Sequence, residues 1–540
     1  MHTELVLFGL LLAVTVLAVA ARWIRVPYPI LLVLGGSALG FTPGMPDVSL
    51  DPDLVLLIFL PPLLYAAAFF ANLHELRRNV RPIGLLAIGL VLATMGAVAV
   101  VAHAAVGLSW AVAFTLGAVV APTDAVAPLT IVRRLGVPRR VITVIEGESL
   151  TNDWTALVLY RFAVAAVVSG SFSLAEAGPR FLLTGLGGLA IGLAAGHVVA
   201  FVRQRLDDPP TEITVSLLTG YAAYLPAEEL GFSGVIAAVT VGIFMGSRTS
   251  RVTTPTVRMQ GFAVWEILQF LLNAFLFMLI GLQLPSVLDG LGGRGAGELA
   301  GYAALVGAVV VGVRVVWVFV FTYLPRVVFP RIAERDPYPS WRPVAALSWT
   351  GMRGGVSLAA ALAIPLTIDG GAPFPDRDLV IFLTYAVIVT TLVLQGLTLP
   401  AVVRALGLEE DGLDSEEELH ARVQTARRAR ERVEELSGEE WVNADTAVRL
   451  RGLYDWRHRR FSAQADGDGA HYDERSQAYQ RLVREVIAAE RGALLALRNE
   501  GRITDEVMRR VERDLDLEET RLETWAVPGP LYSFDRGRTR

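Results

Sequence analysis

Acidic and polar side chains stand inside an apolar stretch of the chain that runs from Val144 to about Val168. The stretch is long enough to cross a lipid bilayer, and an acid at the centre of a membrane helix costs about 2.5–3.5 kcal/mol on insertion scales. Because of helical spacing, Ser149 and Asp153 share one face and Glu148 and Asn152 share the neighbouring face. The first face offers oxygen ligands for a hard cation, and the second offers a carboxylate that an arginine could neutralise. A plainer interpretation places Glu148 among lipid headgroups and Asp153 in an internal hydrogen-bond network.

A second polar centre is the sequence Ala121-Pro-Thr-Asp-Ala-Val-Ala-Pro128, in which two prolines bracket Thr123 and Asp124. Proline removes helical hydrogen bonds, and unwound backbone at membrane depth is tolerated only where it lines a cavity or is buried in protein. The sequence therefore predicts a broken helix here. Asp124 either caps the broken end or, together with Thr123, coordinates an ion there; the two roles are compatible.

A second break is predicted where glycines surround an arginine, in Ser348-Trp-Thr-Gly-Met-Arg-Gly-Gly-Val-Ser357. A pair of interrupted membrane segments is a sequence indication of a transporter binding site. Arg353 needs a partner if it is buried, and Glu148 is the expected one; the alternative is that Arg353 extends to the membrane surface. Arg314 lies deep in another apolar run, and the sequence identifies no partner for it.

Composition limits the class of protein. The chain has 540 residues, 53% of them hydrophobic, and a mean hydropathy of +0.49, which are values typical of a membrane protein. Cysteine is absent, which excludes disulfides and thiolate chemistry, and the net charge of −5 gives no indication of nucleic-acid binding. Near residue 405 the apolar runs give way to dense charge. We therefore expect a transmembrane domain at 1–405 and a helical tail at 406–540, which is either a regulatory domain or a dimer-stabilising or disordered appendage. Its amphipathic stretches at 416–436, 472–498 and 504–522 are divided by Gly438, Gly467–Gly469 and Gly501.

Arginine-rich loops alternate with acidic or neutral ones along the first 405 residues. By the positive-inside rule this places the N-terminus outside and the tail in the cytoplasm. Residues 4–20 lack a basic flank before the apolar run, which favours a retained first span over a signal peptide. About thirteen spans are expected, with spans 1–6 and 8–13 as inverted halves. They are placed at 4–22, 28–42, 54–72, 83–105, 109–133, 147–169, 180–203, 212–229, 233–246, 262–284, 299–325, 343–366 and 378–403.

The chain resembles the bacterial sodium/proton exchangers of the monovalent cation–proton antiporter family over about residues 1–405. The resemblance rests on Gly147-Glu-Ser-Leu-Thr-Asn-Asp153, Pro122-Thr-Asp124 and Gly351-Met-Arg-Gly-Gly-Val-Ser357, and also on Phe270–Gln283 and Leu60-Pro-Pro-Leu-Leu-Tyr65. It implies an all-α fold of thirteen helices with two broken, crossing helices, a homodimer, and a mobile bundle that works against a dimerisation domain.

The resemblance also implies roles for individual residues. Asp153 binds the cation or proton with Asn152 beside it, Asp124, Thr123 and Ser149 complete a Na+ site, and Glu148 forms a structural ion pair with Arg353. One departure concerns the helix with the Pro-Pro motif. Many relatives carry an acid after this motif, whereas this chain has Tyr65-Ala-Ala-Ala68, so a possible extra ligand is missing and the cation preference stays open.

The expected mechanism is exchange without ATP or another cofactor. Burial disfavours the ionised form of a carboxylate, so one carboxylate can hold either a proton or a hard monovalent cation near neutral pH. Because Asn152 and not a second acid adjoins Asp153, we expect electroneutral one-for-one exchange of Na+ or Li+ for H+. Such exchange would serve pH and sodium homeostasis across a bacterial cell membrane. Alternatives are K+/H+ exchange and, in another class, a cation channel or a receptor that signals through the tail. The sequence shows no nucleophile–base pairing or metal motif that would indicate an enzyme.

Overall fold

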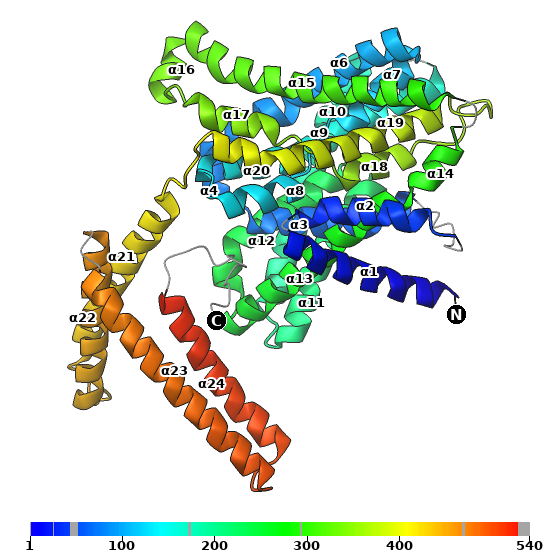
Figure 1. Ribbon diagram of the computed structural model, residues 1–540. Coiled ribbons are helices and arrows are strands. Elements are labelled where there is room, and N and C mark those ends of the chain that lie inside the picture. The colour runs from blue at the N-terminus through cyan, green and yellow to red at the C-terminus, as the bar shows by residue number, and fades with distance from the viewer. Residues whose placement is uncertain are drawn as a thin grey trace. The chain divides into compact units, whose positions relative to one another are not determined.

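The fold is known from a computed structural model that describes residues 2–24, 26–43, 52–170, 174–291, 294–466 and 470–526. The regular elements of these residues are helices, and an isolated bridge joins Thr367 to Pro373. The chain divides into two compact units, Met1–Glu409 and Glu410–Arg540 (Figure 1). The predicted divider Gly467–Gly469 lies outside the described residues.

The helices of the first unit form two groups that differ in their packing partners. In the first group, α3 packs on α12, α2 packs on α13, and α10, α11 and α12 pack on one another. Close helix contact depends on small residues, as at Gly36 of α2, where an added Cβ would lie 2.3 Å from the carbonyl oxygen of Met278. The members of this group are α1 (His2–Ile24), α2 (Tyr28–Gly40), α3 (Pro52–Phe70), α10 (Leu174–Arg203), α11 (Pro209–Glu229), α12 (Gly234–Val252) and α13 (Pro255–Leu282).

The second group surrounds α7, which packs against α6, α9 and α19. Three of its elements are π-turns inside longer helices, a feature that often marks functional sites. Its members are α5 (Val80–Gly84), η1 (Leu85–Leu90), α6 (Val91–Val101), η2 (Ala102–Val106), α7 (Trp110–Val120), α8 (Val126–Val132), α9 (Arg139–Ser169), α15 (Ala296–Val328), α17 (Trp341–Trp349), α18 (Gly355–Leu362), α19 (Arg377–Thr390), η4 (Thr391–Gln395) and α20 (Gly396–Ala405). Short helices α4 (Leu73–Arg78), η3 (Arg133–Leu135), α14 (Leu284–Asp289) and α16 (Pro330–Arg335) complete the unit.

Both predicted breaks are present. The first lies between Val120, where α7 ends, and Val126, where α8 begins. The second lies between Trp349, at the end of α17, and Gly355, at the start of α18. The helix that carries the acids differs from expectation at its start: α9 begins at Arg139, although the prediction placed the span at 147–169.

Within the described residues, five helices are long and apolar enough to cross a membrane, and four apolar helices are shorter. The five are Val80–Val106, Gly178–Arg203, Pro255–Asp289, Ala296–Val328 and Arg377–Ala405. A helix or a pair of half-helices lies at each position where the sequence predicts a span. The all-helical, polytopic character is therefore confirmed, while the count of thirteen spans and their inverted repeat stay predictions.

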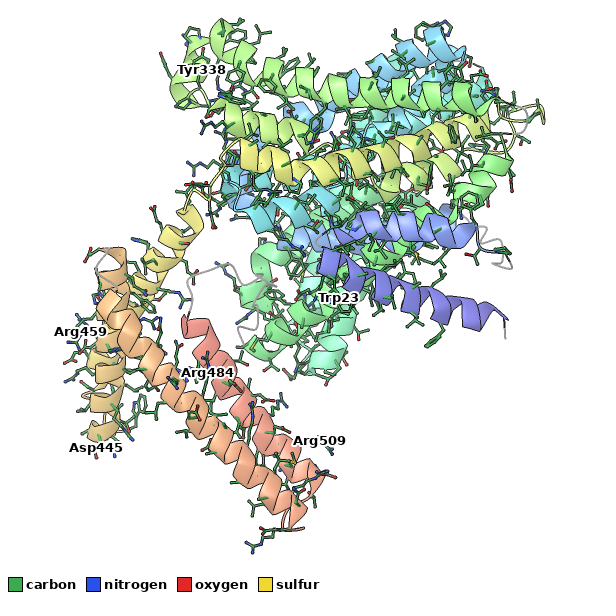
Figure 2. All side chains as sticks on the ribbon, viewed as in Figure 1. Trp23, Tyr338, Asp445, Arg459, Arg484 and Arg509 are labelled. Carbon is green, nitrogen blue, oxygen red and sulfur yellow. The ribbon has the colours of Figure 1, made fainter. Side chains whose placement is uncertain are left out.

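The second unit consists of two helix pairs. In one, α21 (Leu413–Leu436) packs on α22 (Ala444–Ala465), and in the other α23 (Ala470–Asn499) packs on α24 (Asp505–Ala526). The predicted amphipathic stretches lie in α21, α23 and α24. A small apolar core of Ile487, Leu515 and Leu522 joins the second pair. Exposed arginines such as Arg459, Arg484 and Arg509 cover the outer faces (Figure 2).

Candidate cation-binding site

Asp153 lies in the middle of α9 and is buried, with 8% of its surface exposed. Its carboxylate accepts no hydrogen bond from any residue that the structure describes, and it interacts electrostatically with Asp124. Ser149 lies one turn earlier on the same helix and is half-buried. The next side chain, Trp154, packs against an apolar cluster that includes Leu60 and Leu64 of α3, and α9 contacts both α3 and α12. The unpaired carboxylate thus lies where the two helix groups of the first unit meet.

Asp124 lies in the first break and uses its two carboxylate oxygens differently. Oδ1 accepts a 3.1 Å hydrogen bond from the main-chain N–H of Val126, which is the cap expected at the start of α8. Oδ2 is buried and has no hydrogen-bond partner among the described residues. The two roles considered from sequence, a helix cap and an ion ligand, are therefore compatible in the same side chain.

The two breaks meet at Asp124. Its main-chain N–H donates a 2.9 Å hydrogen bond to the carbonyl oxygen of Met352 in the second break. An added Cβ on Gly354 would lie 2.6 Å from the Cβ and 2.8 Å from the Cγ of Asp124. Only glycine fits there without displacing the aspartate, so the glycine cluster of the second break allows the two interrupted helices to cross beside the acid.

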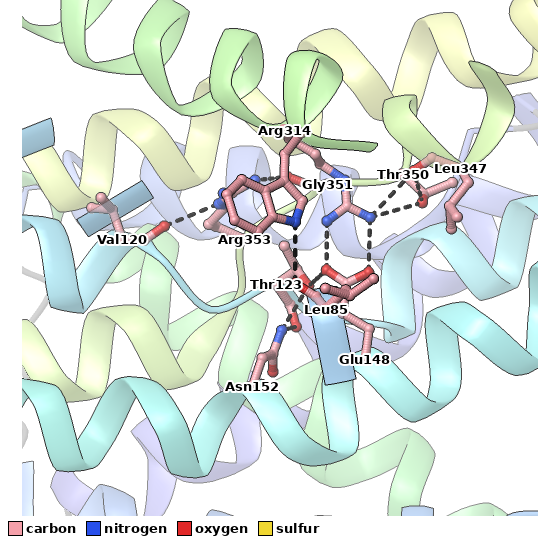
Figure 3. A network of polar contacts seen from close by, with 11 residues as sticks. Leu85, Val120, Thr123, Glu148, Asn152, Arg314, Leu347, Thr350, Gly351 and Arg353 are labelled. Atoms are coloured by element: carbon pink, nitrogen blue, oxygen red, sulfur yellow. Dashed lines mark hydrogen bonds and ion pairs between the residues drawn. The ribbon is translucent and has the colours of Figure 1, made fainter. Parts of the chain in front are cut away.

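Asn152, Thr123 and Glu148 form a chain of buried hydrogen bonds between α9 and the first break (Figure 3). Asn152 Nδ2 donates to Thr123 Oγ1 at 2.8 Å and to the Thr123 carbonyl oxygen at 3.3 Å. Thr123 Oγ1 in turn donates to Glu148 Oε1 at 2.7 Å. The chain fixes the unwound segment against α9, and it leaves Asn152 Oδ1 buried without a partner in the described part of the chain.

The expected ion pair between Glu148 and Arg353 is wrong: Glu148 pairs with Arg314 of α15. Both side chains are buried, at 2% and 1% exposure, and each carboxylate oxygen accepts from one guanidinium nitrogen, with Arg314 Nη2 lying 3.0 Å from Glu148 Oε2 (Figure 3). Arg314 Nη2 also donates to the Leu347 carbonyl oxygen at 3.2 Å and to Thr350 Oγ1 at 3.4 Å. This contact pattern extends the hydrogen-bond chain to the second break.

Arg353 is fully buried, which excludes the alternative that it extends to the membrane surface. Its Nε donates at 3.0 Å to the carbonyl oxygen of Val120, the last residue of α7, and its Nη1 donates to the carbonyl oxygen of Gly351 (Figure 3). The main-chain N–H of Arg353 donates at 3.1 Å to Thr391 Oγ1 in the π-turn η4. A broken helix leaves carbonyl oxygens without intrahelical partners, and these oxygens accept from two of the three guanidinium nitrogens. The third, Nη2, is buried without a hydrogen-bond partner among the described residues.

The helix with the Pro-Pro motif contributes no carboxylate at Ala66, which is fully buried. Its neighbour Tyr65 is also fully buried, and the Tyr65 ring packs against Phe69 at 5.6 Å and Trp265 at 5.2 Å between centroids. This surface is therefore apolar and aromatic. Among the described residues, the interacting carboxylates Asp124 and Asp153 come from the first break and from α9.

Two interrupted helices that cross beside buried carboxylates define a secondary-transporter type of membrane protein. A model of the sodium/hydrogen exchanger transmembrane family matches residues 9–405. The chain belongs to this family, a family of ion-transporting antiporters.

Individual relatives agree with this assignment. An uncharacterised Na+/H+ exchanger of Mycobacterium tuberculosis is 39% identical over 524 residues, which are 96% of each chain. A sodium, potassium, lithium and rubidium/H+ antiporter of Bacillus subtilis is 33% identical over 74% of this chain and 61% of its own. The sodium proton antiporter MjNhaP1 of Methanocaldococcus jannaschii has a similar fold, with a TM-score of 0.58 and 19% identity over 75% of this chain and 99% of its own.

Proposed function

We propose that the protein exchanges Na+ or Li+ for H+ across the membrane by alternating access, one cation for one proton. The observation that carries this proposal is the position of Asp153 beside the crossing of two broken helices and at the junction of two helix groups. Its buried carboxylate has no hydrogen-bond donor among the described residues. Family membership supports cation/proton antiport as the reaction class.

In the proposed mechanism Asp153 holds either a proton or the cation. Asp124 Oδ2, Ser149 and the oxygens of Thr123 and Asn152 complete the cation's shell in the state that closes around it. Oxygen donors of this kind suit hard cations. When Asp153 holds a proton or a cation, the site is neutral and can be carried from one side of the membrane to the other as the helix groups move. The empty, ionised carboxylate would be costly to move through a low dielectric. This difference in cost couples the two fluxes.

The buried charges around the site favour one exchanged charge. Arg314 offsets Glu148 in a direct pair. Asp124 is held by the second break and by α8, since its main-chain N–H donates to Met352 and its Oδ1 caps α8, so the proposal makes it a ligand and not the carrier of the exchanged charge. Asp153 is left as the carboxylate whose charge must be neutralised by the transported ion, so the cycle is expected to be electroneutral.

The test is dissipation of a proton gradient by proteoliposomes when Na+ is added, with Asp153→Asn compared with Glu146→Gln. Glu146 is a matched control because it lies on the same helix and forms a partly exposed pair with Arg133. We expect wild type and Glu146→Gln to collapse the gradient and Asp153→Asn to be silent. An Asp153→Asn variant that still exchanges would make Asp124 the carrier.

Competition between the two ions gives a second test. Each unit fall in pH raises the proton concentration tenfold, so the apparent KM for Na+ should rise as the solution is acidified, and saturating Na+ should restore the rate. Electroneutral exchange should proceed at the same rate when a membrane potential is imposed. A current driven by Na+ during exchange would contradict the one-for-one ratio.

K+/H+ exchange is the alternative, and the Bacillus subtilis relative named for potassium as well as sodium supports it. The missing acid at Ala66 removes a ligand that could tighten the site around a small ion. Measuring gradient collapse with Na+, Li+ and K+ in turn separates the alternatives. A cation channel would instead pass Na+ down its gradient with no proton flux.

The proposal also covers the location, orientation and oligomeric state of the protein. We place it in the bacterial cell membrane as a homodimer that contacts lipid, with the N-terminus outside and the helical tail, residues 406–540, in the cytoplasm. Its partners are then Na+ (or Li+ or K+) and H+, with no nucleic acid, no resident cofactor and no enzymatic reaction. Its task would be pH and sodium homeostasis.

A further inference from the structure

A small cavity of about 20 Å3 lies among the ends of α10, α11, α12 and α13. It is separate from the candidate cation site. Its polar lining comes from Arg203, Ser216, Thr249, Thr253 and Arg258, and Phe69 and Phe262 line it on the apolar side. The helix ends here adjoin the arginine-rich loops after α10 and α12, so the cavity lies near a membrane surface and not at the bilayer centre.

Arg203 has a donor that the protein does not use. The side chain is 4% exposed, and its Nε and Nη2 both donate to Glu212 Oε1, at 3.2 Å and 3.0 Å. Its Nη1 is buried and has no hydrogen-bond partner among the described residues, although the side chain lines the cavity. An unpaired buried guanidinium N–H is costly, so an acceptor that enters the cavity would be stabilised there.

The other polar groups of the cavity also favour an acceptor. Ser216 Oγ accepts a 3.1 Å hydrogen bond from Trp265 Nε1 and also interacts with the hydroxyl of Tyr65, so its hydrogen can be directed to Tyr65 or to a ligand. Arg258 uses only Nη1, which donates at 2.7 Å to the Thr253 carbonyl oxygen, and so it keeps further donors. The hydroxyls of Thr249 and Thr253 already donate to carbonyl oxygens of α12.

The net charge of the lining is positive. Glu212 offsets Arg203, and Arg258 has no acidic partner among the described residues. The N-terminus of α13, capped by Thr254, adds its partial positive charge beside Val257. The combination of a spare guanidinium N–H, a serine hydroxyl and a second arginine matches an oxyanion.

We propose that this cavity binds the phosphate group of an anionic ligand, with Arg203 Nη1, the Ser216 hydroxyl and Arg258 as donors. The cavity has room for a group the size of one water molecule, so a single phosphate oxygen enters it and the rest of the group lies in the opening. Arginine suits phosphate because its planar fork matches the geometry of the oxygens.

A membrane lipid is the source that the surroundings favour. Phe262 beside the cavity is 41% exposed and packs edge-on against Phe70, which is 37% exposed, with 5.5 Å between ring centroids. These rings form an apolar surface next to the polar opening. A lipid would place its phosphate at the arginines and an acyl chain on the rings, whereas free inorganic phosphate would use the arginines alone.

The test is native mass spectrometry of the full chain in detergent, titrated with phosphatidylglycerol. Arg258→Gln should weaken binding about tenfold, as expected for loss of one charge-assisted contact. Arg205→Gln is the matched control, since Arg205 is exposed, lies over the Phe201 ring at 3.4 Å and does not line the cavity. It should bind like wild type. The double variant Arg203→Gln/Glu212→Gln removes the spare donor without leaving an unpaired acid, and it should also lose binding.

Thermal unfolding distinguishes the two sources. If inorganic phosphate, compared with chloride at equal ionic strength, stabilises wild type but not Arg258→Gln, the site accepts free phosphate; if only the lipid does so, the ligand is a lipid. The proposal is overturned if Arg258→Gln binds phosphatidylglycerol as wild type does. It is also overturned if Arg205→Gln loses as much binding, because the basic surface would then act without the cavity. Neither readout depends on ion exchange.

Discussion

Glu148 and Arg314, which are 166 residues apart in sequence, form a buried ion pair that joins α9 to α15. The pair continues at both ends: Glu148 accepts from Thr123 in the first break, and Arg314 donates to Thr350 at the second. A single polar chain therefore connects the two interrupted helices through fully buried groups. The charge pair holds the unwound segments in place and is not available to the transported ion.

Breaking this pair should destabilise the protein strongly. Glu148→Gln or Arg314→Gln leaves the other charge buried and unpaired, which typically costs about 3–5 kcal/mol. The double variant Glu148→Gln/Arg314→Gln should cost less than the sum of the two single variants, because it leaves no charge unpaired. Thermal unfolding in detergent measures the three effects.

Arg133→Gln provides the comparison for a surface pair. Arg133 contacts Glu146 with half of its side chain exposed, so its loss should cost at most about 1 kcal/mol. Additive effects of Glu148→Gln and Arg314→Gln, or effects no larger than that of Arg133→Gln, would show that the buried pair contributes nothing special to stability.

Thr123 should matter for cation affinity through its hydroxyl. In Thr123→Ala the donor to Glu148 and the hydroxyl acceptor for Asn152 are both lost, so Asn152 keeps only its longer 3.3 Å contact with the carbonyl oxygen of residue 123 and is held less firmly at the crossing. We expect kcat/KM for the cation to fall about tenfold, which corresponds to the loss of one or two buried hydrogen bonds. Thr123→Ser keeps the hydroxyl and should stay near wild type in the same proteoliposome assay. Equal losses in both variants would mean that the methyl group, not the hydroxyl, is required.

The positions of the helices could be predicted because apolar length and loop charge are local properties of the sequence. Both breaks were predictable for the same reason, since proline and clustered glycine act on their own segments. The start of α9 was missed because Arg139 and Arg140 look like loop residues, although they continue the helix and Arg140 finds Asn79 as a partner at 3.2 Å. The π-turns could not be predicted, because neither apolar periodicity nor proline and glycine positions distinguish them from the surrounding α-helix.

The partners within the site were less predictable. Arg314 and Arg353 are both deep arginines, and the spacing of residues in the sequence does not say which one faces Glu148. Chemical type suggested a carboxylate for Arg353, but its Nε and Nη1 donate to the carbonyl oxygens of Val120 and Gly351 instead, while its Nη2 has no hydrogen-bond partner among the described residues. A broken helix always exposes such acceptors, so the break itself was the available indication that a buried arginine could be paired without an acid.

The contact between α2 and α13 should not tolerate a methyl group. An added Cβ on Gly281 would lie 2.2 Å from the carbonyl oxygen of Val33. An added Cβ on Gly36 would lie 2.3 Å from the carbonyl oxygen of Met278. Gly36→Ala or Gly281→Ala must therefore separate the helices, at a cost of about 1–3 kcal/mol in thermal unfolding. Gly9→Ala in α1 meets nothing within 4 Å and should be neutral. Equal behaviour of the three variants would contradict the close packing.

Gly354→Ala tests whether the crossing of the two breaks sets the geometry of the site. Because an added Cβ would lie 2.6 Å from the Cβ of Asp124, either the aspartate or the second break must move. Main-chain atoms of both breaks are joined by the hydrogen bond from Asp124 to Met352, so the movement displaces the unpaired Oδ2 as well. We expect cation-driven gradient collapse to fall at least about a hundredfold, as is usual for a displacement of about 1 Å in a binding geometry.

Gly312→Ala of α15 is the matched control for this substitution, because it lies in the same helix group and an added Cβ there has nothing within 4 Å. It should exchange at the wild-type rate. Thermal unfolding separates a local from a global effect: Gly354→Ala should keep most of its stability while losing transport, since the strain is confined to two unwound segments. A Gly354→Ala variant with wild-type exchange would show that the breaks can separate without disturbing the ion, and Asp124 would then act only as the cap of α8.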